Sequence, residues 1–167
     1  DGTIWCRADG AHGAFHLAPP GELISTLGDR RPSDSGYDPS VPWPQDLRTI
    51  RRAAGPFNRP TKVIEAPSGE LYATDGYGNA SVHRFTAEGR LVRTWGGPGE
   101  EAGRFLLPHG LWVDARERLW VADREHYRLQ LFTLEGEFLR SIDDPGYPSE
   151  IWSDGEFLYV ADIEAGV

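Results

Sequence analysis

Hydrophobic and polar positions alternate along the chain in short runs. Each run has four to six residues, many of them β-branched or aromatic, and ends at turn residues such as Pro67-Ser68-Gly69. A period of two is typical of half-buried strands, and no segment sustains the period of about 3.6 residues of an amphipathic helix. The pattern therefore predicts an all-β protein. Two groups of four strands are expected, at 62–66, 70–74, 81–86 and 91–95, and at 110–114, 118–122, 128–133 and 137–142.

The same pattern recurs along the sequence. The segments TIWCRAD, ELYATD, RLWVAD and FLYVAD each end in aspartate with an aromatic residue three or four positions earlier, at Asp9, Asp75, Asp123 and Asp162. The second and third of these aspartates lie 48 residues apart, and the third and fourth 39. Repeats of about 40 to 50 residues with four strands each are typical of β-propeller blades. The sequence therefore predicts a β-propeller of four-stranded antiparallel blades.

The repeat divides the chain into blades. We expect the end of a first blade over 1–27, complete blades over 58–97 and 98–143, and the first half of a further blade over 144–167. This amounts to about three to three and a half blades, whereas propellers have roughly four to eight. The sequence contains no methionine, even at position 1. We therefore expect the chain to be the middle of a larger propeller.

Residues 28–57 interrupt the repeat. The segment is rich in Pro, Ser and Asp, and a connection of this length is uncommon unless it is functional or mobile. Within it, QDLRTIRRAA at 45–54 is expected to form a short helix. We interpret 28–57 as a long insertion between two blades.

Composition narrows the possible partners. The net charge is −9, and Arg30-Arg31 and Arg51-Arg52 are the only adjacent basic pairs. Nucleic acid is therefore not expected, because phosphate binding needs clustered Lys and Arg. No window has the roughly 18 uninterrupted apolar residues of a membrane-spanning helix. The single cysteine, Cys6, has no partner for an internal disulfide and leaves the compartment undetermined.

Polar loops are expected on one face of the propeller. Each strand reverses the one before it, so the connections into first strands and the loops between second and third strands lie at the same end. His109, the loops at 75–81 and 123–128, and the 28–57 insertion all fall there. The opposite face carries ordinary turn residues. A ligand site is therefore expected on the first face.

His109 has two interpretations. It lies between Pro108 and Gly110 at the start of a first strand, nearest the central axis. A zinc site needs about three protein ligands, and the equivalent residues of the neighbouring blades are Thr61 and Ser149. The pattern alone therefore favours a turn or channel histidine over a metal ligand.

Other polar residues are assigned structural roles. The aspartates recur in every blade, so we expect them to cap the backbone of the loop between second and third strands rather than to catalyse. The remaining histidines show no partner spacing and are expected to be structural or surface residues: His12, His16, His83 and His126.

Several motifs together resemble one family. They are FNRPT at 57–61, DGYGN at 75–79, TWG followed by a Gly-rich loop, LPHGL at 107–111 and VADRE at 121–125. VADREHYRLQLF is similar to the NHL-repeat signature, and the set resembles peptidyl-α-hydroxyglycine α-amidating lyase and its bacterial relatives. The match covers about residues 57 to 135 and leaves out 29–55. The resemblance implies a six-bladed propeller that cleaves a C-terminal α-hydroxyglycine to a peptide amide and glyoxylate.

The same resemblance implies a zinc site. Zinc is held in the central channel by one histidine from each of three alternating blades, and a calcium ion lies deeper in the channel. His109 matches the zinc histidine of the fourth blade, while the other two match positions outside this sequence. Thr61 and Ser149 fall in blades without a zinc ligand, so they no longer count against a metal.

Two further residues match the active site of the family, Tyr77 and Arg124. Zinc with an open position lowers the pKa of a bound hydroxyl, so Tyr77 is expected to take or position the hydroxyl proton. The planar fork of Arg124 suits a substrate carboxylate. Structural alternatives remain, since Tyr77 could be a turn aromatic and Arg124 a partner of Glu125 or Asp75.

The chain also departs from the family. Asn58 and Gly78 stand where animal enzymes have a disulfide pair, and Trp120 and Leu131 stand at a second pair. Both absences fit a bacterial relative and leave the lyase activity less secure. The resemblance favours a secreted or periplasmic location.

Two other functions remain open. The main alternative is a non-catalytic NHL-repeat propeller that binds a protein or small ligand on the same face, and a sugar-lactonase-type propeller is a weaker third. The lyase would take a small molecule or a peptide C-terminus as substrate. The 167-residue chain alone is expected to show no turnover, because most of the implied ligands lie outside it.

Overall fold

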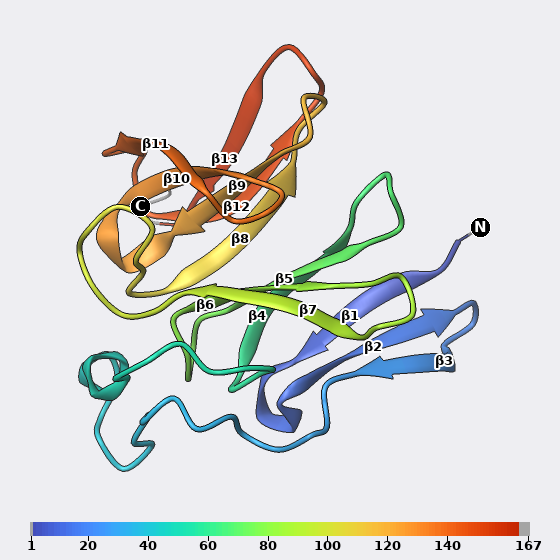
Figure 1. Cartoon of the computed structure of the whole chain (residues 1–167), viewed down its shortest axis with the longest axis horizontal. Helices are drawn as coiled ribbons and strands as arrows, with labels where there is room; N and C mark the ends of the chain where they lie inside the picture. Colours follow the sequence, from blue (N-terminus) through green and yellow to red (C-terminus); the bar gives the residue numbers. More distant parts are fainter. Residues whose placement is uncertain (1, 164–167) are drawn as a thin grey trace.

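The computed structural model describes residues 2–163, and the chain is all-β, as the sequence predicts. Four antiparallel sheets follow one another along the chain and lie side by side in that order, from blue through green and orange to red (Figure 1). Neighbouring strands of each sheet are consecutive in sequence, so every connection within a sheet is a simple reversal. This arrangement is the blade pattern of a propeller.

The strands are grouped by sheet. The first sheet contains β1 (Ile4–Ala8), β2 (Gly13–Ala18) and β3 (Glu22–Leu27). The second contains β4 (Pro60–Glu65), β5 (Leu71–Asp75), β6 (Ser81–Phe85) and β7 (Leu91–Gly96). The third contains β8 (Pro108–Val113), β9 (Arg118–Asp123), β10 (Arg128–Thr133) and β11 (Phe138–Asp143). The fourth contains β12 (Pro148–Ser153) and β13 (Leu158–Asp162), and short 3-10 helices occur at η1 (Asp9–Ala11), η2 (Gln45–Thr49) and η3 (Arg124–His126).

The eight strands expected in the second and third sheets are all present, each within two residues of its expected bounds. The first strands β4 and β8 begin earlier than expected because Pro60 and Pro108 still pair with an aspartate of the next strand, and proline is tolerated as the first residue of a strand. A bulge follows each proline, and in β8 it leaves His109 outside the regular pairing. A bulge re-aims a side chain, so this one is where His109 can turn away from the sheet.

Apolar layers between the sheets hold them together. Successive side chains of a strand point to opposite faces, and β5 buries both sets. Leu71 and Ala73 pack toward the first sheet, whereas Tyr72 joins the layer between the second and third sheets. In β9, Val121 belongs to that same layer and Trp120 to the one against the fourth sheet. The inner strands β5 and β9 are therefore buried on both faces, whereas β11, at the outside of its sheet, is exposed.

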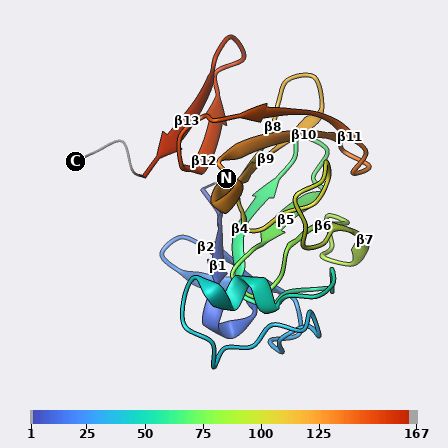
Figure 2. The ribbon, with the colours of Figure 1, turned by 90° about the vertical axis from the view of Figure 1, so that its left-hand side faces the viewer.

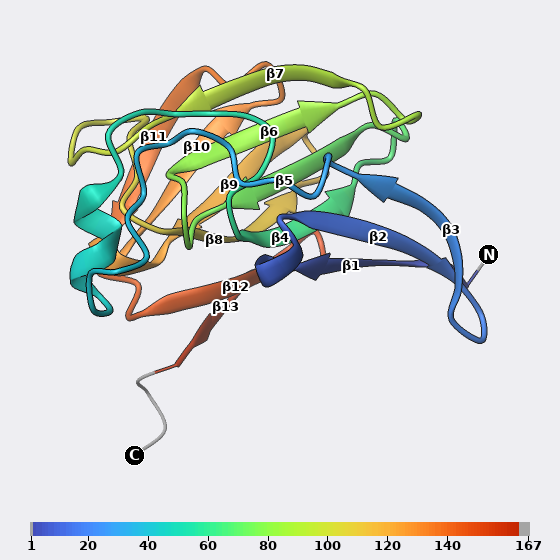
Figure 3. The ribbon, with the colours of Figure 1, turned by 90° about the horizontal axis from the view of Figure 1, so that it is seen from below.

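The first strands of the sheets lie closest to one another. β4 contacts β1 and β8, and β8 contacts β12, while β7 lies at the outside of its sheet (Figure 3). The start of β8, with His109, is thus near the line about which the sheets turn. The described residues contain no helix long or apolar enough to cross a membrane.

The 28–57 insertion runs across the end of the sheets (Figure 2). Its helix is shorter than the 45–54 expected, because η2 ends at Thr49 and Ile50 is already extended. The backbone N–H groups of Arg51 and Arg52 donate to the carbonyl of Ser35 instead of continuing the helix. Leu47 and Ile50 are buried in the layer between the second and third sheets, and they tie the insertion to the sheets.

Candidate functional site

The three residues expected at the site lie together at one end of the sheets. Tyr77 comes from the loop between β5 and β6, His109 from the bulge of β8, and Arg124 from η3 after β9. The Tyr77 hydroxyl lies 3.2 Å from Nε2 of His109, and Nη1 of Arg124 lies 3.4 Å from the same hydroxyl. The structure thus forms a continuous line of contacts from Arg124 through Tyr77 to His109.

Close packing of two sheets brings the Tyr77 loop to His109. A Cβ added to Gly76 would lie 2.4 Å from the carbonyl oxygen of Pro108, so only glycine permits this approach. Thr61 donates its hydroxyl to that same carbonyl at 2.7 Å, and Thr74 donates to the carbonyl of His109 at 2.6 Å. The backbone on both sides of the imidazole is therefore fixed by the neighbouring sheet.

The hydrogen bond at Nδ1 sets the tautomer of His109. Nδ1 lies 2.6 Å from the carbonyl oxygen of Ser149, which only accepts, so Nδ1 carries the proton. Burial lowers the pKa of His109; the Ser149 carbonyl opposes this effect, and the charges of Arg124 and Arg7 add to it. The ring is therefore neutral at pH 7, and the lone pair of Nε2 faces Tyr77, which donates to it.

Of the two structural partners considered for Arg124, the structure pairs it with Glu125. Its Nε and Nη2 each lie 3.1 Å from Oε1 of Glu125, and its side chain is only 9% exposed. Tyr147 donates its hydroxyl to the same Glu125 oxygen. Burial and the Glu125 carboxylate both raise the pKa of Tyr147. Arg124 therefore contacts Glu125 and Tyr77 at the same time. Asp75 binds Asn58, Asn79 and His83 instead.

Tyr77 has several other neighbours that sequence reasoning missed. The guanidinium carbons of Arg7 and Arg59 each lie 5.8 Å from the centre of its ring, close to the 5.6 Å of Arg124. Trp43, from the insertion, meets it edge to face at 5.9 Å. Arg59 lies within the FNRPT motif, which was a usable signal, but nothing in the local sequence marks Trp43.

The recurring aspartates cap a different loop from the one expected. Asp75 accepts the backbone N–H of Asn58 at 2.7 Å, Asp123 accepts that of Leu106 at 3.0 Å, and Asp162 accepts that of Tyr147 at 3.1 Å. All three donors belong to the connection into a first strand, so the expectation of a cap on the following loop is wrong for Asp75 and Asp123, while the loop after Asp162 lies outside the described residues. It holds for Asp9, which accepts the N–H of Gly10 at 2.7 Å.

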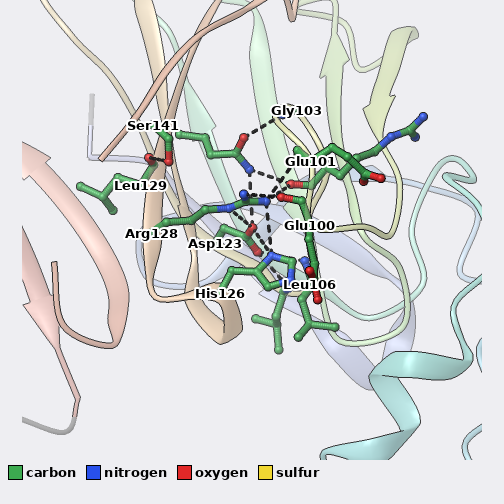
Figure 4. A network of polar contacts seen from close by, with 12 residues as sticks. Glu100, Glu101, Gly103, Leu106, Asp123, His126, Arg128, Leu129 and Ser141 are labelled. Carbon is green, nitrogen blue, oxygen red and sulfur yellow. Dashed lines mark hydrogen bonds and ion pairs between the residues drawn. The ribbon is translucent and has the colours of Figure 1, made fainter. Parts of the chain in front are cut away.

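Asp123 also binds two side chains that follow it in the chain (Figure 4). Its Oδ2 lies 2.7 Å from Nδ1 of His126 and 2.9 Å from Nε of Arg128. Arg128 donates onward to the carbonyl oxygens of Glu100 and Arg104. This network holds η3, and with it Arg124, in place, so His126 has the structural role expected for it.

An Asp–His–hydroxyl arrangement also lies inside the second sheet, apart from the candidate site. His83 lies 3.3 Å from Asp75 and 2.9 Å from the hydroxyl of Thr94, and His83 and Asp75 are fully buried. Gly55 of the insertion packs directly against these side chains, since a Cβ there would lie 2.7 Å from the Thr94 hydroxyl. No substrate reaches these groups. His83 is therefore structural, as expected.

The positions of the two animal disulfides are adjacent in the structure. A Cβ added to Gly78 would lie 2.6 Å from the Asn58 side chain, and Trp120 is the cross-strand partner of Leu131. Each pair has the proximity that a disulfide requires. Among residues 2–163, no group of three or more His, Cys, Asp or Glu side chains is placed to hold a metal ion.

Sequence comparisons identify several distant relatives of the chain. No protein-family model matches the chain. Peptidylglycine alpha-amidating monooxygenase of Rattus norvegicus is 29% identical over 160 residues, which cover 92% of the chain and 15% of that protein. A probable peptidyl-alpha-hydroxyglycine alpha-amidating lyase of Caenorhabditis elegans is 35% identical over 137 residues, covering 80% and 34%. NHL repeat-containing protein 3 of Mus musculus is 28% identical over 151 residues, covering 86% and 39%.

Solved structures show the same fold. A streptogramin B lyase superposes with a TM-score of 0.65 at 17% identity, covering 98% of the chain and 46% of that protein. The Xanthomonas campestris gluconolactonase XC5397 gives a TM-score of 0.58 at 18% identity, covering 94% and 44%. The chain thus spans less than half the length of the proteins it matches. It is a distant homologue of the amidating lyases and of NHL-repeat proteins, and its sheets correspond to about half of a β-propeller.

Proposed function

We propose that the intact natural protein is a zinc-dependent lyase that cleaves peptidyl-α-hydroxyglycine to a peptide amide and glyoxylate. The observation that carries this proposal is the line of contacts from Arg124 through Tyr77 to His109, at 3.4 and 3.2 Å. The names of two relatives as amidating enzymes support the same reaction. The substrate is then a peptide C-terminus, and this chain supplies part of the site.

The state of His109 fits a zinc ligand. Metal-binding histidines usually donate their other ring nitrogen to a carbonyl or carboxylate, which fixes the tautomer. The contact between Nδ1 and the Ser149 carbonyl has this form, and it leaves the lone pair of Nε2, which accepts from Tyr77 in this structure, as the one that zinc would use. When bound, zinc supplies a Lewis acid that polarises the substrate. Further ligands would come from outside residues 2–163.

Tyr77 is placed to move the proton that the reaction requires. The substrate hydroxyl loses a proton, the carbon–nitrogen bond breaks with its electron pair going to nitrogen, and nitrogen takes up a proton. Tyr77 accepts the first proton at its oxygen as it gives its own to the departing nitrogen, so its protonation state is restored. No water is consumed, and the atoms of the substrate are all found in the amide and glyoxylate.

Arg124 is a positioning residue in this scheme. It donates to the oxygen of Tyr77 and so stabilises negative charge that develops there during proton transfer. Glu125 holds the rest of the guanidinium at 3.1 Å. We therefore assign the main effect of Arg124 to Tyr77, and binding of the substrate carboxylate as its second role.

The proposal is tested on the intact natural protein. Its zinc content is measured together with glyoxylate release from a peptide ending in α-hydroxyglycine. His109→Ala is expected to lose both, because a zinc ligand is removed. His126→Gln is the matched control and is expected to keep both, since glutamine can still donate to Asp123. A folded, metal-free wild type without turnover would overturn the proposal.

A non-catalytic propeller is the second candidate, favoured by the similarity to NHL repeat-containing protein 3. It would bind a protein or small ligand on the face that carries Tyr77 and His109. The flanking sequence of the natural protein separates the two candidates. Pro-His motifs about two blades before and two blades after Pro108-His109 support the lyase, and their absence supports the binding protein.

A further inference from the structure

The 28–57 insertion places a tryptophan at the edge of the site. The ring of Trp43 meets Tyr77 at 5.9 Å with an interplanar angle of 61°, and the guanidinium of Arg124 lies 5.8 Å from the Trp43 ring. Trp43 nevertheless keeps 49% of its surface exposed. One side of the indole is thus fixed against two site residues, and the other is open to a ligand.

The insertion is anchored on both sides of Trp43. Before it, the Ser35 hydroxyl donates to the carbonyl of Gly78, in the Tyr77 loop, at 2.5 Å. After it, Leu47 and Ile50 are buried between the second and third sheets. The Tyr37 hydroxyl donates to Asp46 at 2.7 Å and closes the segment on itself. Trp43 is therefore held in a fixed position at the edge of the site.

The position of Trp43 determines which residue of a peptide substrate it contacts. The Tyr77 oxygen and Nε2 of His109, 3.2 Å apart, mark where the C-terminal residue reacts. The centre of the Trp43 ring lies 5.9 Å from that of the Tyr77 ring, which places the indole about one ring away from these atoms. Neighbouring Cα atoms of a peptide are about 3.8 Å apart. The side chain that reaches Trp43 therefore belongs to the residue just before the reacting one.

The charges beside Trp43 favour an apolar side chain there. Arg124 is paired with Glu125 at 3.1 Å, and Arg59 with Asp9 at 3.3 Å. Each guanidinium already has a carboxylate partner, which weakens its attraction for an acidic side chain at this position. The exposed indole offers apolar area, and aromatic pairs gain more than their buried area alone would give.

We propose that Trp43 is a specificity-determining residue that selects an apolar or aromatic side chain immediately before the reacting C-terminal residue. This inference rests on the proposed function, which supplies the peptide and its direction. Trp43 lies outside the motifs that carry the resemblance to the amidating lyases, so we assign this preference to the 28–57 insertion.

The test compares two peptides that end in Phe-α-hydroxyglycine and Ala-α-hydroxyglycine, using the intact natural protein. The ratio of their kcat/KM values is measured for wild type, Trp43→Ala and Trp43→Phe. Trp43→Ala is expected to lower the Phe/Ala ratio about tenfold, and Trp43→Phe to restore most of it. A ratio of rates is unaffected by the fraction of folded enzyme, so a merely structural role would not move it.

Trp152→Ala is the matched control. Trp152 is 50% exposed, like Trp43, but it lies near the far end of β12. Its replacement is expected to leave the Phe/Ala ratio unchanged. An unchanged ratio in Trp43→Ala, or an equal fall in both alanine variants, would overturn the assignment of Trp43.

Binding separates this inference from the proposed function. If no peptide is turned over, dissociation constants are measured by calorimetry for unreactive peptides ending in Phe-Gly and Ala-Gly. Tighter binding of the Phe peptide that is lost in Trp43→Ala supports the role of Trp43 even though the lyase proposal has failed. Equal binding of both peptides to the wild type contradicts it.

Discussion

At the scale of single residues, each side chain of the site is held by its neighbour. The Ser149 carbonyl fixes the tautomer of His109, and Nε2 of His109 then accepts from Tyr77. Arg124 donates to Tyr77 and is itself held by Glu125. Because every member has a partner on its far side, the geometry does not depend on a substrate to form.

Replacing Tyr77 by phenylalanine separates the chemistry from the packing. Tyr77→Phe keeps the ring between Arg124 and His109 and removes only the oxygen that would move the proton. In the intact natural protein, kcat is expected to fall about 100-fold or more, with KM changing little. Glyoxylate release measures both constants, and the thermal unfolding midpoint serves as the control for folding. A variant with wild-type kcat would exclude Tyr77 from the proton transfer.

At the scale of elements, the strands were predictable and the surroundings of the site were not. Short apolar runs bounded by turn residues mark where strands begin and end, so β4 to β11 follow from the sequence, and so does the meeting of Tyr77, His109 and Arg124 at one end. Trp43 has no such signal. Its position depends on tertiary anchors such as the bond from Ser35 to Gly78, which no local pattern encodes.

The repeat itself suggests how the buried His83 can be replaced. Gln130 occupies the same place in the third sheet and lies 3.5 Å from Asp123, as His83 lies 3.3 Å from Asp75. His83→Ala leaves a buried carboxylate short of a partner and is expected to lower the free energy of unfolding by about 2–4 kcal/mol. His83→Gln is expected to cost about 1 kcal/mol. Urea unfolding measures both, and equal losses would contradict the equivalence.

Asp114, in the turn after β8, gives a pH-dependent contribution to stability. Burial raises its pKa, but hydrogen bonds from Arg118, from two backbone N–H groups and from Trp120 outweigh this effect and lower it below the usual 3.8. The ionised form is thus favoured in the folded state, and its contribution is present above that value and lost as the pH falls below it.

Asp114→Asn tests this assignment. The variant is expected to be less stable than wild type by about 1 kcal/mol at pH 7, and the difference should shrink as the pH is lowered through 3.8 toward 2. Urea unfolding across this range measures both proteins. A difference that stays constant with pH would show that the carboxylate charge of Asp114 contributes nothing to folding.

At the scale of the whole molecule, stability is distributed unevenly among the sheets. The inner strands β5 and β9 are almost fully buried, while large apolar side chains are exposed on the fourth sheet, including Phe157 and Tyr159 at 58% and 48%. In repeat architectures each unit is stabilised mainly by its neighbours. The site draws on the first, second and third sheets, with Ser149 from the fourth, so within the 167-residue chain the support from Ser149 is its least protected part.

Hydrogen exchange of the 167-residue chain measures this gradient. Leu71–Asp75 and Leu158–Asp162 are second strands of their sheets, but all five residues of the first are buried and none of the second is. Opening a strand costs more when more apolar contacts must be broken. The amides of Leu71–Asp75 are therefore expected to exchange about 100-fold more slowly or better. Equal rates would mean that the sheets unfold as one unit, so that Ser149 and its hydrogen bond to His109 are as persistent as the inner core.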